Sequence, residues 1–421
     1  MKKKANRRTK KQTESRHSQR TLRLSEVIER NLFGFLMQEG LKALDAFLER
    51  DMERACGERG KRKGEHQATR WGSADGRLVL GGRRVKVQRP RARKEGEEVE
   101  LPTWSQFSDE DPLDERTMEQ MVLGVSTRNY ERSLEDVPDD LEPHGASKSA
   151  ASRRFVDMTQ AQVEEWLSRD LSDLKIVSIM IDGIEVAGQA IIVALGIDES
   201  GRKHPLGLWQ GATENSTVCE ALLNSLIDRG LDGQGRYLFV IDGAKALRKS
   251  VRTIFGERGI VQRCQQHKLR NVLAHVPKAL ETSVRQAIQE AYRSRSKTTA
   301  KRKLIALSDS LESDYPDASA SLREGLDETL TVKDWALPVV LERTLSTTNP
   351  IENLNGSIRR VTRNVKRWRD GSMIRRWVAA GILEAERGFR RLRGCKGMPD
   401  LINAIRGAEQ TTLVDQEATA A

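Results

Sequence analysis

The sequence predicts an α/β core whose central sheet is buried on both faces, with mainly helical regions before and after it. Helical stretches alternate with nearly continuous apolar runs at residues 176–181, 190–197, 237–241 and 259–264. Such runs are typical of strands covered on both faces, and their alternation with helices indicates an α/β layer. The chain has 421 residues, more than one domain of usual size, so two or three domains are expected.

The composition limits the classes of function. Lys and Arg number 72 against 61 Asp and Glu, which leaves a net charge of +11. No apolar run reaches the ~18–20 residues of a bilayer-spanning helix, so we predict neither a transmembrane chain nor a membrane partner. The four cysteines form no CxxC pair, which argues against a disulfide framework or a common zinc finger and favours the reducing cytoplasm.

Positive charge is concentrated in two segments. Residues 1–20 contain nine Lys or Arg and one Glu, and residues 358–393 contain twelve against three acids. Clusters of one sign favour a polyanionic partner, and nucleic acid is the first candidate. A solvated helix face or a disordered tail is the alternative for either cluster. The residues after position 20 are mixed and charged, so no signal peptide is expected.

The first regular elements are a helix and a hairpin. Apolar residues recur mostly at spacings of three to five in residues 24–56, which predicts a helix with Leu36, Leu44 and Phe47 on one broad face. Residues 76–90 alternate apolar and polar positions around two glycines and predict a hairpin with a basic outer face. Basic residues there also protect a sheet edge from aggregation, so DNA contact is one of two interpretations.

Residues 115–170 are expected to form short helices. Gly124 interrupts one helix, and Ser126 or Thr127 is a candidate N-cap of the next. Residues 144–155 predict a Ser-capped helix of small residues that ends at two arginines, as suits the recognition helix of a helix-turn-helix. A helix that is merely exposed is the alternative. The predicted DNA contacts of this region are Lys148, Arg153 and Arg154.

Acids follow two of the apolar runs. One run ends at Asp182 and another at Asp242, and glycine comes next in both. The end of a buried strand suits a catalytic group, because the sheet fixes the side chain while the loop leaves it accessible. Two converging carboxylates need neutralisation, and oxygen ligands favour Mg²⁺ or Mn²⁺. Asp-Gly is also a common turn pair, so a turn role for either aspartate stays open.

A third acid lies in the segment 347–355. Asn349 can cap a helix that starts at Pro350, which places Glu352 in the first turn. This carboxylate can hold a metal while basic residues one and two turns later grip a phosphate strand. A glutamate that only favours the helix dipole is the equal alternative. The basic residues are Arg359, Arg360 and Arg363.

Four blocks occur in a fixed order: Ile181–Glu185 with Ala194–Asp198, Phe239–Ala246, Val261–Lys268, and Thr348–Asn355. In this order and spacing they resemble the Mutator-type transposases of bacterial insertion sequences, over roughly residues 20–395. The resemblance implies an RNase H-like catalytic core, a mixed sheet flanked by helices. It implies an Asp-Asp-Glu triad that binds two Mg²⁺ ions, for which Mn²⁺ can substitute. The triad would be Asp182, Asp242 and Glu352.

The resemblance also assigns Cys264 and His267 to the surroundings of the active site, in a supporting rather than a metal-binding role. His267 is expected to start a helix whose Lys268 and Arg270 contact DNA phosphates. The loop at 183–190 is plainer than in many members of that family, so we predict no substrate contacts there.

The predicted organisation has seven parts. They are a basic disordered tail at 1–22, an N-terminal helical region with a basic hairpin at 23–110, a helix-turn-helix-like DNA-binding domain at 111–172, the first part of the RNase H-like core at 173–277, an all-helical insertion at 278–346, the Glu-bearing helix and basic C-terminal helices of the core at 347–395, and a flexible tail at 396–421.

The expected function is that of a DNA transposase that cleaves the ends of its element and joins the 3′-hydroxyls to DNA. Its expected partners are the terminal inverted repeats and target DNA, bound by a homodimer or larger assembly at the nucleoid in the cytoplasm. Two alternatives stay open. One is an RNase H-like nuclease or resolvase, and the other is a catalytically silent DNA-binding relic of a transposase.

Overall fold

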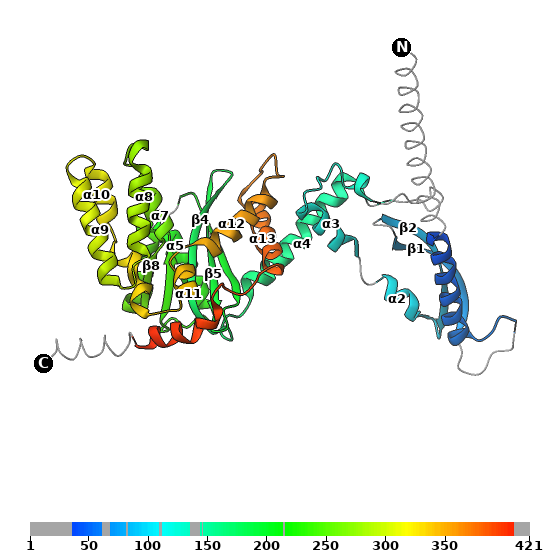
Figure 1. Ribbon diagram of the computed structural model, residues 1–421. Coiled ribbons are helices and arrows are strands. Elements are labelled where there is room, and N and C mark those ends of the chain that lie inside the picture. Colours follow the sequence, from blue (N-terminus) through cyan, green and yellow to red (C-terminus); the bar gives the residue numbers. More distant parts are fainter. Residues whose placement is uncertain are drawn as a thin grey trace, which may run out of the picture. The chain divides into compact units, whose positions relative to one another are not determined.

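The computed structural model describes residues 36–60, 68–80, 83–108, 112–134, 144, 146–213 and 215–407. The chain divides into two compact units, Met1–Met158 and Thr159–Ala421 (Figure 1). The predicted basic tail at 1–22 and the glycines of the predicted hairpin turn lie outside the described residues. No helix among the described residues is long and apolar enough to cross a bilayer. The finer seven-part division stays a prediction.

In the first unit, a helix over residues 36–56 packs on an antiparallel sheet. The sheet consists of β1 (Thr69–Leu80), β2 (Arg83–Lys94) and β3 (Glu97–Val99). The pairing of β1 with β2, in which Leu78 lies opposite Val85, confirms the predicted hairpin.

The helix over residues 36–56 buries a narrower stripe than predicted. Leu44, Leu48 and Met52 follow one another at i, i+4 and face the sheet. Leu36 and Phe47 fall off this stripe and are exposed, so placing them on the buried face was wrong.

Helices follow the sheet: α2 (Pro102–Ser108), α3 (Pro112–Val122), the 3₁₀ turn η1 (Glu131–Ser133) and α4 (Lys148–Ser168), which begins in the first unit and ends in the second. The expectation of a helix capped by Ser126 or Thr127 is wrong, because a turn forms there, in which Asn129 N donates to Ser126 O at 2.8 Å. The Ser cap of α4 is confirmed, since Ser147 Oγ accepts from Ala150 N at 3.3 Å.

Helix α4 is longer than predicted. It does not end at its two arginines but continues to Ser168, because apolar side chains keep recurring at helical spacing. Phe155, Val163 and Trp166 are all buried. The helix-turn-helix interpretation of this region stays a prediction.

The second unit is built on a mixed five-stranded sheet. Its strands are β4 (Ile176–Val186), β5 (Gln189–Asp198), β6 (Lys203–Gly211), β7 (Tyr237–Ile241) and β8 (Gly259–Arg263), in the order β6-β5-β4-β7-β8. Strands β4, β5 and β6 are antiparallel neighbours, and β7 and β8 run parallel to β4. All four predicted strands are confirmed. Strand β6 was not predicted, because its sequence KHPLGLWQG lacks a long apolar run.

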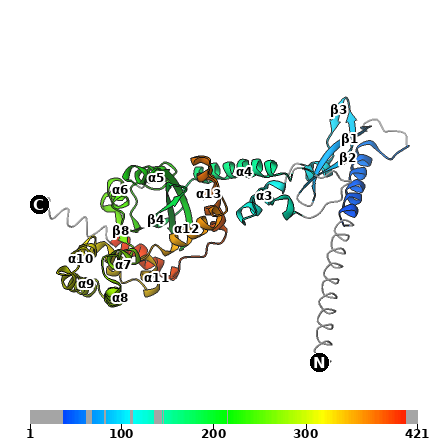
Figure 2. The same ribbon diagram turned by 90° about the horizontal axis from the view of Figure 1, so that it is seen from above.

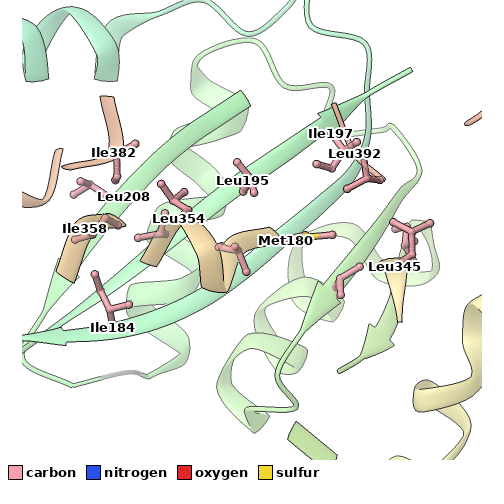
Figure 3. Packing of buried hydrophobic residues seen from close by; sticks show 14 of the residues in the cluster. Met180, Ile184, Leu195, Ile197, Leu208, Leu345, Leu354, Ile358, Ile382 and Leu392 are labelled. Carbon is pink, nitrogen blue, oxygen red and sulfur yellow. The ribbon is translucent and has the colours of Figure 1, made fainter. Parts of the chain in front are cut away.

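Helices cover both faces of this sheet (Figure 2). One face packs against α5 (Ser216–Asp228) and α6 (Lys245–Phe255), which is followed by the 3₁₀ turn η3 (Gly256–Arg258). The other packs against α12 (Asn349–Thr362) and α13 (Gly371–Arg387). Figure 3 shows Leu354 and Ile358 of α12 lying over Met180, Leu195 and Leu208 of the sheet.

The residues between β8 and α12 are helical, as predicted. Residues 269–330 contribute to a core of their own, whereas Leu341 and Leu345 pack in the cluster of the sheet. They form α7 (Gln265–Leu273), α8 (Lys278–Tyr292), α9 (Lys297–Glu312), α10 (Pro316–Arg323), η4 (Asp327–Trp335) and α11 (Val339–Leu345). After α13 come η5 (Cys395–Gly397) and a helix over residues 398–407. That last helix buries Leu401 and Ile405, so the predicted flexible tail cannot begin at residue 396.

Candidate active site

Two aspartates lie side by side on neighbouring parallel strands. The parallel ladder between β4 and β7 ends at the pair Ile181 and Ile241, and Asp182 and Asp242 are the next residues along the chain. Adjacent strands are about 4.8 Å apart, so the two carboxyl groups start from neighbouring positions.

Both aspartates belong to the sheet face that α12 covers. Side chains alternate between the two faces of a strand. Met180 and Ile184 of β4 pack in the α12 cluster, and so does Val240 of β7. Asp182 and Asp242 share their parity and therefore point toward α12.

The position of Asp182 differs from the prediction in one respect. It is not a strand end, because β4 continues to Val186 through its antiparallel pairing with β5, where Asp182 lies opposite Val193. Only the side that faces β7 is free of strand pairing beyond Ile181. Asp242 does follow the last residue of its strand, and its Oδ1 accepts from Ala244 N at 2.8 Å.

Asp182 has the most perturbed carboxyl group of this site. Burial raises its pKa to about 6, and the charges of Asp242 and Glu352 act in the same direction. The charge of His267 and a hydrogen bond from Asn355 oppose the rise. Asp182 is therefore repelled by both of the other acids, and a bound cation would relieve this repulsion.

Replacing Asp182 with Asn is expected to stabilise the metal-free protein at neutral pH. A carboxyl group whose pKa is about 6 in the folded state, against its usual 3.8, opposes folding once it is ionised. This cost grows as pH rises from about 4 to 6 and is fully present above 6, where it reaches about 1–3 kcal/mol. In urea unfolding with a chelator present, the free energy of unfolding of Asp182→Asn should therefore exceed that of the wild type at pH 7. At pH 4 the two values should be close. The exposed Asp173→Asn is the control, and a less stable Asp182→Asn at pH 7 would contradict the assignment.

Glu352 lies in the first turn of α12, as predicted. The N-cap residue is Thr348 rather than Asn349, which is the first helical residue. No side-chain cap bond forms, because Thr348 Oγ1 turns instead to Glu352 Oε1 at 3.1 Å. Arg270 Nη1 lies 3.8 Å from the same carboxylate oxygen.

Thr348 connects Glu352 to the Cys264 and His267 pair. Its hydroxyl is fully buried and lies 3.3 Å from both Cys264 Sγ and His267 Nδ1. A hydroxyl has one proton and two lone pairs. If Thr348 donates to Glu352, it must accept from His267, which places a proton on Nδ1 and turns Nε2 toward Glu352 Oε1, 3.6 Å away.

Replacing Thr348 with Val should leave three polar neighbours without their shared partner. Each lost bond to a buried polar group costs about 1–3 kcal/mol, so the free energy of unfolding should fall by at least that amount. Thr348→Ser keeps the hydroxyl and serves as the matched control in the same urea titration. Equal free energies of unfolding for the Val and Ser variants would show that the hydroxyl does not contribute to stability.

Cys264 and His267 perturb each other's protonation. Burial opposes ionisation of the Cys264 thiol, but its side-chain and backbone hydrogen bonds with His267 and Thr348, which include donation from Thr348 N at 3.4 Å, outweigh it and lower its pKa. The hydrogen bond to Cys264 raises the pKa of His267 against the effect of burial, assisted by the negative charges of Cys264, Asp242 and Glu352.

Cys264, His267 and Glu352 also form a possible metal-binding group. Within the described part of the chain, it is the one set of three such side chains whose ligand atoms all lie within 4.8 Å of one another. A buried thiol is a poor ligand for Mg²⁺, which prefers oxygen. The carboxylates, rather than the Cys and His pair, therefore suit that ion.

Asn355 is a site residue to which the sequence assigned no role. It is 1% exposed, and its Nδ2 donates to Asp182 Oδ2 at 2.7 Å. Its Oδ1 is buried without a hydrogen-bond partner among the described residues. Because Asn355 and Glu352 are three residues apart on α12, one helix face presents both to the aspartates. Asn355 stands in the block that carries the family resemblance, and that was the only available signal.

The predicted DNA contacts of the second unit divide into two groups. Lys268 is 3% exposed and donates to Ser321 O and Glu324 O, so its assignment to DNA was wrong. Arg270 has a side chain that is 59% exposed. The other three, Arg359, Arg360 and Arg363, are exposed along α12.

A basic hollow lies beside α12 and α13. Its volume is about 560 Å³, and Arg360 lines it together with other basic side chains. These are Lys203, Arg387 and Arg390. The predicted contacts of the first unit lie on α4, where Lys148 and Arg153 are exposed and Arg154 is half-buried.

The sequence profile described as "Transposase, Mutator family" matches residues 9–391. The chain belongs to this family of transposases. It is 28% identical over 362 residues to the transposase for insertion sequence element ISRM5 of Rhizobium meliloti (strain 1021), which covers 84% of this chain and 88% of the relative.

Other relatives of the transposase have the same kind of name. The transposase for insertion sequence element IS6120 of Mycolicibacterium smegmatis is 30% identical, over 58% of this chain and 75% of the relative. The transposase for insertion sequence element IS256 in transposon Tn4001 of Staphylococcus aureus is 26% identical, over 63% of this chain and 68% of the relative. Family membership confirms the resemblance noted from the four blocks and implies DNA cleavage and strand transfer in general.

Proposed function

We propose that this transposase cleaves the ends of its insertion sequence and joins the 3′-hydroxyls to DNA by phosphoryl transfer at Asp182, Asp242 and Glu352. One observation carries the proposal. Two aspartates at the ends of adjacent parallel pairings share the sheet face beneath α12, and burial, Asp242 and then Glu352 of that helix raise the pKa of Asp182.

The donor set suits divalent cations that prefer oxygen. The mutual repulsion of the acids and the unpartnered Oδ1 of Asn355 both favour a cation at this place. Asp182 and Asp242 would hold one Mg²⁺, and Asp182 with Glu352 a second, with Mn²⁺ able to substitute. When bound, such ions activate the attacking water or 3′-hydroxyl and stabilise the leaving oxygen.

The remaining side chains orient the carboxylates. Asn355 fixes one oxygen of Asp182, and Thr348 fixes one oxygen of Glu352. His267 Nε2 and Arg270 Nη1 lie 3.6 and 3.8 Å from Oε1 of Glu352, within ion-pair distance of its carboxylate. Cys264 serves as a buried partner of Thr348 rather than as a ligand.

The fold and the domains follow from the same proposal. The antiparallel strands β6-β5-β4, extended by the parallel strands β7 and β8 and covered by helices on both faces, support an RNase H-like core. The helices between β8 and α12 would then be the insertion at 278–346. The region 111–172 would recognise the terminal inverted repeats. Two ends must be cut together, so we propose a homodimer or larger assembly on DNA.

A test in cells compares the wild type with Glu352→Gln. The gene and its native flanks are placed on a plasmid, and outward amplification detects joined ends or empty donor sites. We expect these products from wild type and from the control Glu290→Gln, an exposed position on α8, and none from Glu352→Gln at matched expression. Products from Glu352→Gln would remove this residue from the chemistry. Products from none of the three would favour a silent DNA-binding protein.

A further inference from the structure

Helix α6 has one apolar and one basic face. Its buried residues include Leu247, Val251 and Phe255, which pack in the cluster beneath the sheet. Its other face has basic residues at i, i+3, i+4 and i+7, so they form one continuous stripe. They are Lys245, Arg248, Lys249 and Arg252.

The basic stripe borders a hollow of about 650 Å³. All four of its basic residues line the hollow, together with Thr253, Arg263, Glu324 and Gly325. No aromatic side chain is among these lining residues, so the hollow offers no aromatic ring on which a base could stack. Its chemistry is that of a surface for phosphate groups.

The hollow adjoins the loop that carries Asp242. Lys245 is three residues beyond this aspartate and begins α6. Arg263, which lines the hollow, also reaches Gly243: its Nη1 lies 3.6 Å from the place a Cβ there would occupy. A phosphate chain passing the carboxylates on this side would meet α6 next.

Two charges of the stripe, on Lys245 and Lys249, are available to a ligand. Arg248 and Arg263 both bind Glu328, and Arg252 pairs with the exposed Glu257 at 2.6 Å. Lys245 and Lys249 are exposed and have no ion pair within the described part of the chain. The stripe therefore keeps a positive surplus, with its arginines partly held and its lysines available.

We infer that the α6 stripe binds DNA backbone phosphates on one side of the cleaved bond, while the basic hollow beside α12 and α13 binds DNA on the other side. The two surfaces belong to helices on opposite faces of the sheet, and the carboxylates lie where the β4–β7 ladder ends, next to the loop that leads into α6. Such contacts position DNA without reading its sequence. This inference rests on the proposed function, because it assumes that DNA crosses the carboxylates.

The first test measures DNA binding without cleavage. Full-length Asp182→Asn protein, with and without Lys245→Ala/Lys249→Ala/Arg252→Ala, is titrated into labelled duplex that contains one element end and its flank, at several salt concentrations. Losing up to three phosphate contacts should lower the slope of log affinity against log salt by about 2–3. The control triple is Lys278→Ala/Arg302→Ala/Lys303→Ala, three exposed residues on α8 and α9. Equal slopes for the two triples would overturn the inference.

Shortened substrates identify the DNA that α6 contacts. One duplex lacks the flank, and the other lacks the inner part of the element end. The effect of the α6 triple should disappear on one of them and persist on the other; persistence on both would overturn the one-sided arrangement. Lys245→Arg/Lys249→Arg, which keeps the charge, should bind as the parent does. Cleavage by Asp182→Asn would refute the proposed chemistry while leaving these binding results intact, so the two failures are distinguishable.

Discussion

We expect Asp182→Asn and Asp242→Asn each to abolish DNA cleavage, while DNA affinity stays at the wild-type level. An amide cannot supply the negative charge that holds a divalent cation, and metal stabilisation of the reacting oxygens is worth several kcal/mol, or about a thousandfold or more in rate. DNA affinity persists because the exposed basic residues of α12 and α6 are untouched.

This result is measured with purified protein and a labelled duplex that contains one element end. Cleavage products are resolved on a denaturing gel, and affinity is measured on the same samples. Asp173→Asn, an exposed position ahead of β4, should cleave as wild type does. Parallel loss of binding and cleavage in both active-site variants would indicate a structural role for the two aspartates.

Asn355→Leu is expected to lower the cleavage rate by about 10–100-fold, the usual effect of removing a group that orients a metal ligand. The substitution puts an apolar side chain in this buried position and removes the donor to Asp182 Oδ2. That hydrogen bond lowers the pKa of Asp182, so its loss should move the acidic limb of the pH–rate profile to higher pH.

The pH profile separates orientation from folding. A variant that is only partly folded would lose rate equally at every pH. Asn403→Leu, an exposed position in the helix over residues 398–407, controls for an added leucine. An Asn355→Leu enzyme with the wild-type rate and profile would show that the contact to Asp182 has no part in the reaction.

The buried strands were predictable because both of their faces are covered. The runs at β4, β5, β7 and β8 have apolar side chains at most positions, so they stand out in the sequence. Only the middle of edge strand β6 is buried. The strand also contains His204, Pro205 and Gly207, so its sequence does not look like a strand.

The site was predictable in its acids but not in its surroundings. Asp182 and Asp242 follow apolar runs, whereas the continuation of β4 past Asp182 depends on its pairing with β5. Lys268 looked like a helix-surface residue, but carbonyl groups more than fifty residues later bury it. The pairing of Asn355 with Asp182 arises only when α12 packs on the sheet.

The basic face of α6 was predictable from the sequence, although we did not predict it. The spacing of its basic residues is visible in the printed sequence and predicts one basic helix face. Its relation to Asp242 through Gly243 and Arg263 required the structure.

Direct ligation of a metal by the aspartates is the central claim, and Asp242→Cys tests it most directly. A thiolate accepts Mn²⁺ better than Mg²⁺, whereas a carboxylate serves both. Cleavage by Asp242→Cys, measured in each ion alone, should be lost in Mg²⁺ and partly restored in Mn²⁺. The ratio of the Mn²⁺ rate to the Mg²⁺ rate should then exceed that of wild type by about tenfold or more. Undiminished cleavage in Mg²⁺, or a ratio equal to that of wild type, would contradict the claim.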